Sequence, residues 1–180
     1  MDGVFLKYID EWLYELLIKS VDIMPIRLCK FIAFYYTDAR VRKLYWNRLG
    51  VTMGENSFAN LGLKVVTDGG IVAKGGSDVL IGKNVSIAPN VTFIVASGAN
   101  NGQEINTIPY VRDKLTVSKN ITVEDEVWIG ANVTILPGMR IGCCSVIGAG
   151  AVVTTDVEPY SVYAGVPARK IRDLREQGNG

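Results

Sequence analysis

A strict six-residue repeat runs through the second half of the chain. In steps of six from Val117, one position always holds a β-branched aliphatic residue, and a mostly small or aliphatic residue recurs four places later. A period of six fits neither an amphipathic helix nor a two-sided strand. It fits a solenoid in which each hexad supplies one short strand and a tight corner. The first row consists of Val117, Val123, Ile129, Ile135, Ile141, Ile147 and Val153, and the second of Ile121, Val127, Val133, Met139, Ser145, Ala151 and Val157.

Stacked hexads of this kind predict a three-sided coil. Three hexads make one turn, and equivalent aliphatic residues of successive turns stack into ladders that bury one another. The same phase already occurs in Ile81, Ile87 and Phe93. We therefore predict an all-β core, a parallel β-helix over residues 49–160. Basic residues beyond position 168 predict a short C-terminal helix within residues 161–180.

One polar segment, residues 95–116, breaks the repeat between Phe93 and Val117. It carries glycine and lacks inward aliphatic residues at the required spacing. Solenoids eject such insertions as loops, and loops on a rigid scaffold often hold the binding site. A tolerated surface insertion is the alternative. We expect this protruding loop to contribute to the functional site.

Residues 1–48 carry helical rather than hexad patterning. Apolar residues recur at three- and four-residue steps between residues 4 and 20, which predicts an amphipathic helix. Asp22 with Pro25 predicts the start of a second helix, and Asp38 can cap a third that ends at Gly50. The apolar stripe of the first helix consists of Phe5, Ile9, Trp12, Leu13, Leu16 and Leu17.

Two interpretations of this helical segment stay open. Between positions 27 and 48 the sequence has six basic residues and one acidic residue, Asp38. A basic segment rich in aromatic residues suits an anionic membrane surface, so residues 4–48 could make peripheral membrane contact. The other interpretation is a helical cap that packs its apolar stripe on the rest of the domain. We favour the cap, because Asp10, Glu11 and Glu15 on the first helix would be repelled by anionic lipid.

The composition excludes several classes of function. The chain has no histidine, which removes the commonest general base and excludes zinc enzymes that rely on imidazole. With 19 basic and 18 acidic residues, the net charge of +1 gives no reason to expect a nucleic-acid partner. Cys143 and Cys144 are adjacent and Cys29 stands alone, so we expect no disulfide and a reducing, cytoplasmic setting, with any membrane contact at the inner face. Acidic residues interrupt the N-terminal apolar residues, so we predict neither a signal peptide nor a membrane span.

Three segments carry a resemblance to a known family. Residues 127–138 read VWIGANVTILPG, residues 146–153 read VIGAGAVV, and residues 164–169 read AGVPAR. Together they resemble the hexapeptide-repeat acetyltransferases, in the branch of sugar, galactoside and xenobiotic O-acetyltransferases. The resemblance covers roughly residues 50–175. It implies a left-handed parallel β-helix, an exception to right-handed crossovers, and a homotrimer that binds acetyl-CoA between subunits, needs no metal and acetylates a carbohydrate hydroxyl.

The resemblance also assigns residues to the two substrates. Asn60, in the segment Phe58-Ala-Asn60, matches an asparagine that holds the acceptor, and Trp128 matches a tryptophan that borders the thioester. A corner residue with left-handed backbone is the alternative for Asn60, and trimer packing is the alternative for Trp128. The positions that would meet acetyl-CoA are Gly130, Ala131, Ala149 and Gly150 at the pantetheine arm and Thr154, Arg169 and Arg172 at the adenosine phosphates.

The residue that acts as general base in the family has no counterpart here. The family's loop begins with a histidine that takes the proton of the acceptor hydroxyl during direct attack on the thioester. The matching position is Gly98 or, with one inserted residue, Ala99, and neither can accept a proton. Loss of a positioned base removes a factor of about 10² to 10⁴ in rate.

Three explanations of the missing base stay open. Ala99 could replace a histidine in an engineered variant, the chain could belong to a histidine-free branch, or it could be a trimeric scaffold that binds CoA without catalysis. Glu104 is the best substitute base, because a carboxylate in an apolar groove can have a raised pKa; a solvated loop charge is its alternative role. Asp113 and Tyr110 are weaker candidates. Acceptors of the capsule or lipopolysaccharide type fit the long loop.

Overall fold

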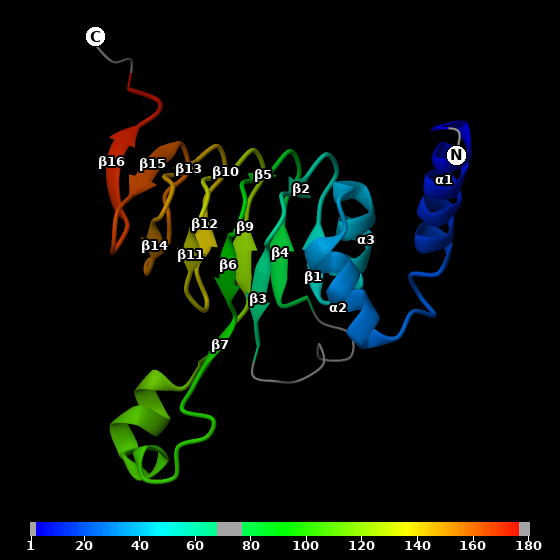
Figure 1. The fold of residues 1–180 in the computed structure, drawn as a ribbon. Coiled ribbons are helices and arrows are strands. Elements are labelled where there is room, and N and C mark those ends of the chain that lie inside the picture. The colour runs from blue at the N-terminus through cyan, green and yellow to red at the C-terminus, as the bar shows by residue number, and fades with distance from the viewer. Residues whose placement is uncertain (1–2, 68–76, 177–180) are drawn as a thin grey trace.

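The computed structural model describes residues 3–67 and 77–176, in which three N-terminal helices precede a coil of short strands (Figure 1). Positions 1–2, 68–76 and 177–180 of the expected segments lie outside the described residues. The helices are α1 (Gly3–Lys19), α2 (Ile26–Tyr35) and α3 (Ala39–Arg48). All three were expected from the sequence. Asp38 caps α3 by accepting from the backbone N–H groups of Arg40, at 2.7 Å, and Val41, at 3.4 Å.

The coil has three faces, each a sheet whose strands are parallel, apart from an antiparallel strand at one edge of the second sheet. The chain visits the first, second and third sheets in turn and then returns to the first. The first sheet contains β1 (Val51–Met53), β4 (Val79–Ile81), β9 (Ile121–Val123) and β12 (Arg140–Ile141). The second contains β2 (Phe58–Ala59), β5 (Ser86–Ile87), β10 (Trp128–Ile129), β13 (Val146–Ile147), β15 (Ser161–Ala164) and β16 (Arg169–Asp173). The third contains β3 (Lys64–Val66), β6 (Thr92–Ile94), β11 (Thr134–Ile135) and β14 (Val152–Val153).

The ladders of the repeat form the core of the coil. Ile135 pairs in register with Phe93 on one side and Val153 on the other, and all three side chains are at most 1% exposed. Ile129 and Ile147 are equally buried one sheet earlier. Each ladder residue therefore removes its neighbours from water, which explains why the six-residue period predicts the parallel strand order.

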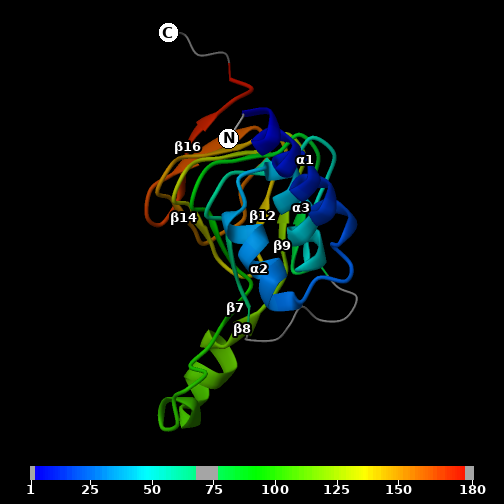
Figure 2. The same ribbon diagram turned by 45° about the vertical axis from the view of Figure 1, so that its right-hand side comes forward.

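The segment that breaks the repeat forms an arm that projects from the coil (Figures 1 and 2). Its stem is an antiparallel pair of β7 (Ala96–Ser97) and β8 (Val117–Ser118), and it holds the short helices η1 (Ile105–Thr107) and η2 (Val111–Leu115). Val117, which starts the first row of the repeat, belongs to this stem instead of an inward ladder. Its expected place in the core is therefore wrong, because it pairs with Ser97 across the base of the arm.

The expected C-terminal helix is wrong. The described part of this segment forms β15 and β16, which pair antiparallel at the edge of the second sheet. Gly165 has a positive φ of 94°, and the chain turns back between the two strands. The free edge of β15 supplies hydrogen-bond partners that outweigh the helix propensity of the basic residues in β16.

The helices cover one end of the coil but do not bury the stripe of α1. Tyr45 on α3 donates its hydroxyl to the Leu17 carbonyl of α1 at 2.9 Å, and Leu17 is buried. In contrast, Trp12 is 64% exposed and Leu16 44% exposed. The expectation that the whole stripe packs on the domain is therefore wrong, because Leu17 at one end of the stripe is buried against α3 while the stripe residues from Ile9 to Leu16 are exposed.

Candidate functional site

One corner of the coil brings several candidate residues into a column. The Asn60 N–H donates to the Ile87 carbonyl at 2.9 Å, the Ala88 N–H to that of Ile129 at 2.9 Å, and the Gly130 N–H to that of Ile147 at 2.8 Å. Asn60, Ala88 and Gly130 therefore stack on the edge between the second and third sheets. We call this edge the corner column. It consists of residues 60–62, 88–90 and 130–132, together with the turn 148–150 of the next coil.

The small residues of the corner column are set by close contact between coils. A Cβ atom on Gly130 would lie 2.6 Å from the backbone N of Ala149, so only glycine fits. The Gly150 N–H donates to the Ala131 carbonyl at 2.8 Å, and Gly150 has a φ of 71°. All four residues assigned to the pantetheine arm thus lie together on two successive coils.

The corner column offers unused backbone donors on successive coils. Neither the Ala131 N–H nor the Ala149 N–H donates to another group of the described residues. The two residues belong to successive coils, whose strands lie about 4.8 Å apart. Both residues carry only a methyl side chain, so both N–H groups can donate to carbonyl groups of a ligand lying along the column.

A groove of about 490 Å³ lies beside this column, between the start of α3 and the second sheet. Asn60 and Trp128 both line it, together with Phe58 and Ser86. Phe58, Ser86 and Trp128 occupy one register across β2, β5 and β10, so two exposed rings flank a serine hydroxyl. Such a surface offers apolar faces and a polar centre, as a ligand with ring faces and hydroxyl groups requires.

Asn60 is presented with its amide nitrogen available. Its Oδ1 accepts from the Leu61 N–H at 2.8 Å, and its Nδ2 has no partner among the described residues. Asn60 is not among the residues with positive φ, which at nearby corners include Asn90 and Asn132. The alternative that Asn60 serves a left-handed corner is therefore wrong.

Arg42 is a groove residue that sequence reasoning missed. Its side chain is only 4% exposed, and its Nη1 donates to the Tyr36 and Thr37 carbonyls at 2.6 and 2.7 Å. Its Nη2 donates to the Ala59 carbonyl at 2.7 Å, directly before Asn60. Burial lowers the pKa of Arg42. Arg42 thus fastens α3 to the coil beside the groove, and nothing in the sequence distinguishes it from the five other basic residues nearby.

The expected position of the base lies apart from this groove. Gly98 lines a separate cavity of about 100 Å³ at the base of the arm, with Thr116 and Ser118. The Ala99 carbonyl accepts from Asn106 Nδ2 at 2.7 Å. Glu104 is exposed on the arm, where its backbone carbonyl accepts from Thr107. One chain therefore does not bring the arm residues and the groove into one cavity.

The weaker substitutes for the base are less suited to proton transfer. The Asp113 carboxylate accepts from Arg112 Nε at 2.8 Å, so its oxygens are already engaged by a cation. Tyr110 is 66% exposed on the outside of the arm. Glu104 is the remaining acidic side chain of the arm and forms no ion pair with a described residue.

Two of the three residues expected at the phosphates carry uncompensated charge. Arg169 and Arg172 are exposed on β16 and form no ion pair with any described residue. The intervening Lys170 is bound to Asp173 at 3.1 Å and to a second carboxylate. Thr154 directly follows β14 at the far end of the third sheet and is half-buried. The two arginines are thus available to an anion.

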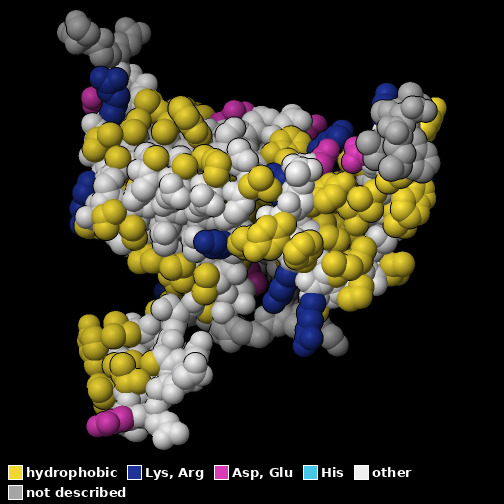
Figure 3. Space-filling model, viewed as in Figure 1, with side chains coloured by type: hydrophobic (Ala, Val, Ile, Leu, Met, Phe, Trp, Pro, Cys, Tyr) yellow, Lys and Arg dark blue, Asp and Glu magenta, His cyan; other side chains and the backbone are white. Residues whose placement is uncertain are grey.

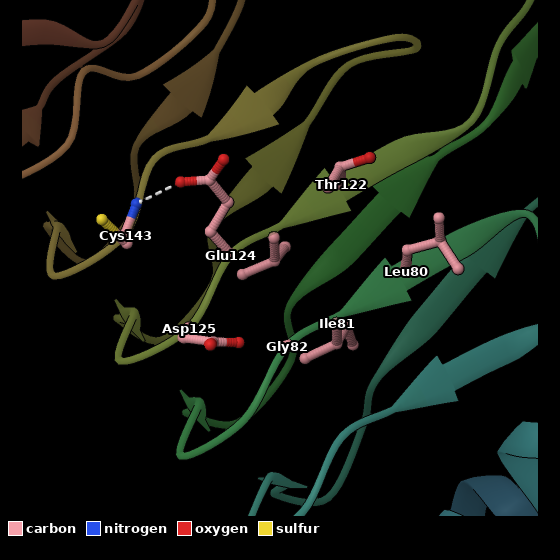
Figure 4. Close-up of a pocket in the computed structure, with 8 residues that line it drawn as sticks. Leu80, Ile81, Gly82, Thr122, Glu124, Asp125 and Cys143 are labelled. Atoms are coloured by element: carbon pink, nitrogen blue, oxygen red, sulfur yellow. Dashed lines mark hydrogen bonds between the residues drawn. The ribbon is translucent and has the colours of Figure 1, made fainter.

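A second groove, of about 400 Å³, lies on the first sheet and contains none of the candidates (Figure 4). Its carboxylates support corners: Glu124 accepts from the Cys143 N–H at 2.8 Å, and Asp125 accepts from the Lys83 N–H at 2.7 Å. Desolvation raises the pKa of the Cys143 thiol, so it is not an activated nucleophile. The acidic lining disfavours a phosphate-bearing ligand. Within residues 3–67 and 77–176, no three His, Cys, Asp or Glu side chains are grouped so as to hold a metal ion.

Comparison with known proteins gives the family. No protein-family model matches the chain. A galactoside O-acetyltransferase of Escherichia coli K12 is 41% identical over 127 residues, which cover 71% of this chain and 56% of that protein. The structure of a hexapeptide-repeat acetyltransferase from Vibrio cholerae is 28% identical, with a TM-score of 0.61 over 89% of this chain and 92% of the other. The chain belongs to the hexapeptide-repeat acetyltransferases.

The chain is also similar to a galactoside acetyltransferase whose structure is a complex with coenzyme A. The two are 39% identical, with a TM-score of 0.54, over 69% of this chain and 56% of the other. The chain spans about half the length of the curated relatives it matches.

Proposed function

We propose that the protein transfers the acetyl group of acetyl-CoA to a hydroxyl group of a carbohydrate. The observation that carries this proposal is the pair of unused N–H groups at Ala131 and Ala149, beside the groove that holds Trp128 and Asn60. They give one continuous surface with separate places for a thioester carrier and for a hydroxyl-bearing acceptor. The names of the galactoside relatives support the acceptor, and the structure of a galactoside acetyltransferase in complex with coenzyme A supports the carrier.

The corner column suits the extended arm of acetyl-CoA. The pantetheine arm carries two amide groups, whose carbonyls can accept from the Ala131 and Ala149 N–H groups on successive coils. Gly130 and Gly150 keep side chains away from that path. At the last coil, Arg169 and Arg172 offer guanidinium groups to the adenosine phosphates, and Thr154 lies at the neighbouring corner.

The groove suits the acceptor. The Asn60 Nδ2 can donate to a sugar hydroxyl, while the rings of Trp128 and Phe58 can pack against the apolar face of a pyranose. We infer acceptors of the capsule or lipopolysaccharide type, because the groove is open and the arm adds further surface for a long saccharide. Three cysteines without a disulfide agree with a cytoplasmic enzyme.

A homotrimer completes the site in this proposal. Gly98 at the base of the arm and Asn60 in the groove line different cavities of one chain. If three left-handed coils pack side by side, the arm of one subunit can reach the groove of the next. The site then forms between subunits, and acetyl-CoA lies along their shared boundary.

The proposed reaction is a direct transfer. The acceptor hydroxyl oxygen attacks the thioester carbonyl carbon, the C–S bond breaks, and the CoA thiolate leaves. A general base takes the hydroxyl proton, and the thiolate gains a proton from it or from water. Glu104 is the candidate for this base, because it is an unpaired carboxylate on the arm and no histidine exists in the chain.

The absence of histidine favours a second candidate function, a trimeric scaffold that binds CoA without catalysis. The same corner column serves both functions, because the N–H groups of Ala131 and Ala149 bind the carrier irrespective of turnover. The two differ in whether free CoA appears when a saccharide is added.

Turnover and CoA binding, measured on the same preparation, test the proposal. We expect calorimetry to detect CoA binding and a thiol reagent to detect free CoA that rises with added galactoside or acidic polysaccharide. Glu104→Gln is expected to lower turnover by about 10² or more without weakening CoA binding. Glu55→Gln, an exposed carboxylate at a coil corner, is the matched control and should not change the rate.

Two further variants distinguish the explanations of the missing base. If Ala99 replaces a lost histidine, Ala99→His or Gly98→His raises turnover by about 10² to 10⁴. An unchanged rate in both variants rejects that explanation. Tight CoA binding without turnover in every variant and with every saccharide supports the scaffold and contradicts the enzyme.

A further inference from the structure

Nine large apolar side chains lie on the surface of α1, α2 and the turn between them. Their exposed fractions run from 38% to 84%, and Figure 3 shows hydrophobic side chains gathered over both helices on the face turned to the viewer. Monomers rarely leave so extended an apolar patch in water. We call this patch the helical surface; it consists of Tyr8, Ile9, Trp12, Leu13, Leu16, Ile23, Leu28, Phe31 and Tyr35.

The charges around the helical surface have one sign on α2. Between Ile26 and Tyr35 the helix carries Arg27 and Lys30, both exposed, and no acidic residue. Neither cation forms an ion pair with a described residue. Cations interleaved with exposed aromatic residues complement an anionic lipid surface.

The acids of α1 point to a different side of that helix. Asp10, Glu11 and Glu15 line a cavity of about 640 Å³ between α1 and the start of α3, which also contains Arg40. Glu15 is further paired with Lys19 at 3.0 Å. The acids that the sequence set against lipid contact therefore lie mainly on the side of α1 that faces this cavity.

We infer that the helical surface docks the protein on an anionic membrane, with the aromatic residues at the level of the lipid headgroups and Arg27 and Lys30 bound to lipid phosphates. Trp and Tyr favour that level because their rings are amphipathic. No described helix is long and apolar enough to cross a bilayer, so the contact is peripheral. The helices cover one end of the coil (Figure 1).

Docking through α2 also holds the acceptor groove near the bilayer. The helix ends at Tyr35, and Thr37, two residues later, lines the groove. A saccharide presented at a membrane surface would then enter the groove without leaving that surface. The docking itself does not depend on the proposed acetyl transfer, since it uses only α1 and α2.

Cosedimentation of the full chain with vesicles tests this inference. We expect binding to vesicles of phosphatidylcholine with phosphatidylglycerol and little binding to phosphatidylcholine alone. The double variant Arg27→Gln with Lys30→Gln should lower the partition coefficient about 30-fold, since each cation near the headgroups contributes about fivefold. Trp12→Gln with Phe31→Gln should lower it as well, because both side chains are more than 60% exposed and leave water only on docking.

The matched control is Val166→Gln with Ile171→Gln, two exposed apolar residues at the other end of the coil. It should bind vesicles like the wild type, and all variants should keep the circular dichroism spectrum of the wild type. The inference is overturned if the wild-type protein does not bind anionic vesicles, or if the double variant of Arg27 and Lys30 binds them as well as the wild type does. Light scattering gives the molecular mass of the protein in solution. If the Trp12 and Phe31 variant differs from the wild type in this mass, and neither protein binds vesicles, the helical surface is a subunit contact and the inference is wrong.

Discussion

Replacement of Gly130 by alanine probes the fold and the proposed carrier site together. The new Cβ would lie 2.6 Å from the Ala149 N and 2.9 Å from the Ile147 carbonyl oxygen, about 0.8 Å inside ordinary contact at the closer atom. Both atoms are backbone, so two coils must move apart. Overpacking of this kind costs about 1 to 3 kcal/mol. The shift also weakens the inter-coil bonds of Gly130 and Gly150, both 2.8 Å, so we expect about 3 kcal/mol.

Urea unfolding followed by circular dichroism measures this effect. With a slope of about 2 kcal/mol per molar, a loss of about 3 kcal/mol lowers the midpoint by about 1.5 M. CoA affinity should fall at least about tenfold in the same variant, because the Ala149 N–H moves with its coil. Gly98→Ala is the matched control. Its Cβ would meet only side-chain atoms, of Thr116 at 3.3 Å and Asn100 at 3.4 Å, so the free energy of unfolding should stay within about 0.5 kcal/mol of the wild type. A Gly130→Ala midpoint equal to the wild type would refute the close-contact reasoning.

Three further predictions follow from single contacts. Ile135→Ala should lower the free energy of unfolding by about 2 to 5 kcal/mol in urea, and Thr134→Ala, on the outer face of the same strand, by less than about 0.5 kcal/mol; equal losses would contradict the inward ladder. Asp38→Ala should cost about 1 kcal/mol at neutral pH. Hydrogen bonds from Arg40 lower the pKa of Asp38, so its contribution is complete above the ordinary carboxyl pKa and is lost as the pH falls through the lowered value; a difference between variant and wild type that grows on acidification would contradict this. Arg172→Gln should weaken CoA binding about tenfold in calorimetry and reduce its salt dependence, and unchanged affinity would remove Arg172 from the phosphate site.

The repeat and the helix caps could be predicted because each is a local pattern. Ile129, Ile135 and Ile147 repeat with the period of the coil and are buried as that period requires. Asp38 caps α3 because its carboxylate needs only the next three residues. The small residues of the corner column were likewise visible, since close coil contact and corner geometry both demand them.

What the sequence did not reveal depends on contacts between distant segments. β16 forms a strand because β15 leaves an open edge, which no pattern within residues 169–173 records. Arg42 is buried because Ala59, 17 residues later, offers it a carbonyl. The exposure of Trp12 depends on which side of α1 meets α3. The groove that joins Asn60 with Trp128 likewise exists only because β2, β5 and β10 share one register.

Acetyl transfer to a saccharide is the most direct test of the central claim, that the corner column and its groove form an O-acetyltransferase site. Purified wild-type protein is incubated with acetyl-CoA and a galactoside or polysaccharide, and mass spectrometry of the saccharide is combined with measurement of free CoA. We expect acetylated saccharide and free CoA in equal amounts, both lost when Trp128→Ala and Asn60→Ala are introduced. If the protein binds CoA but neither free CoA nor acetylated saccharide forms from acetyl-CoA with any of the saccharides, the claim is contradicted.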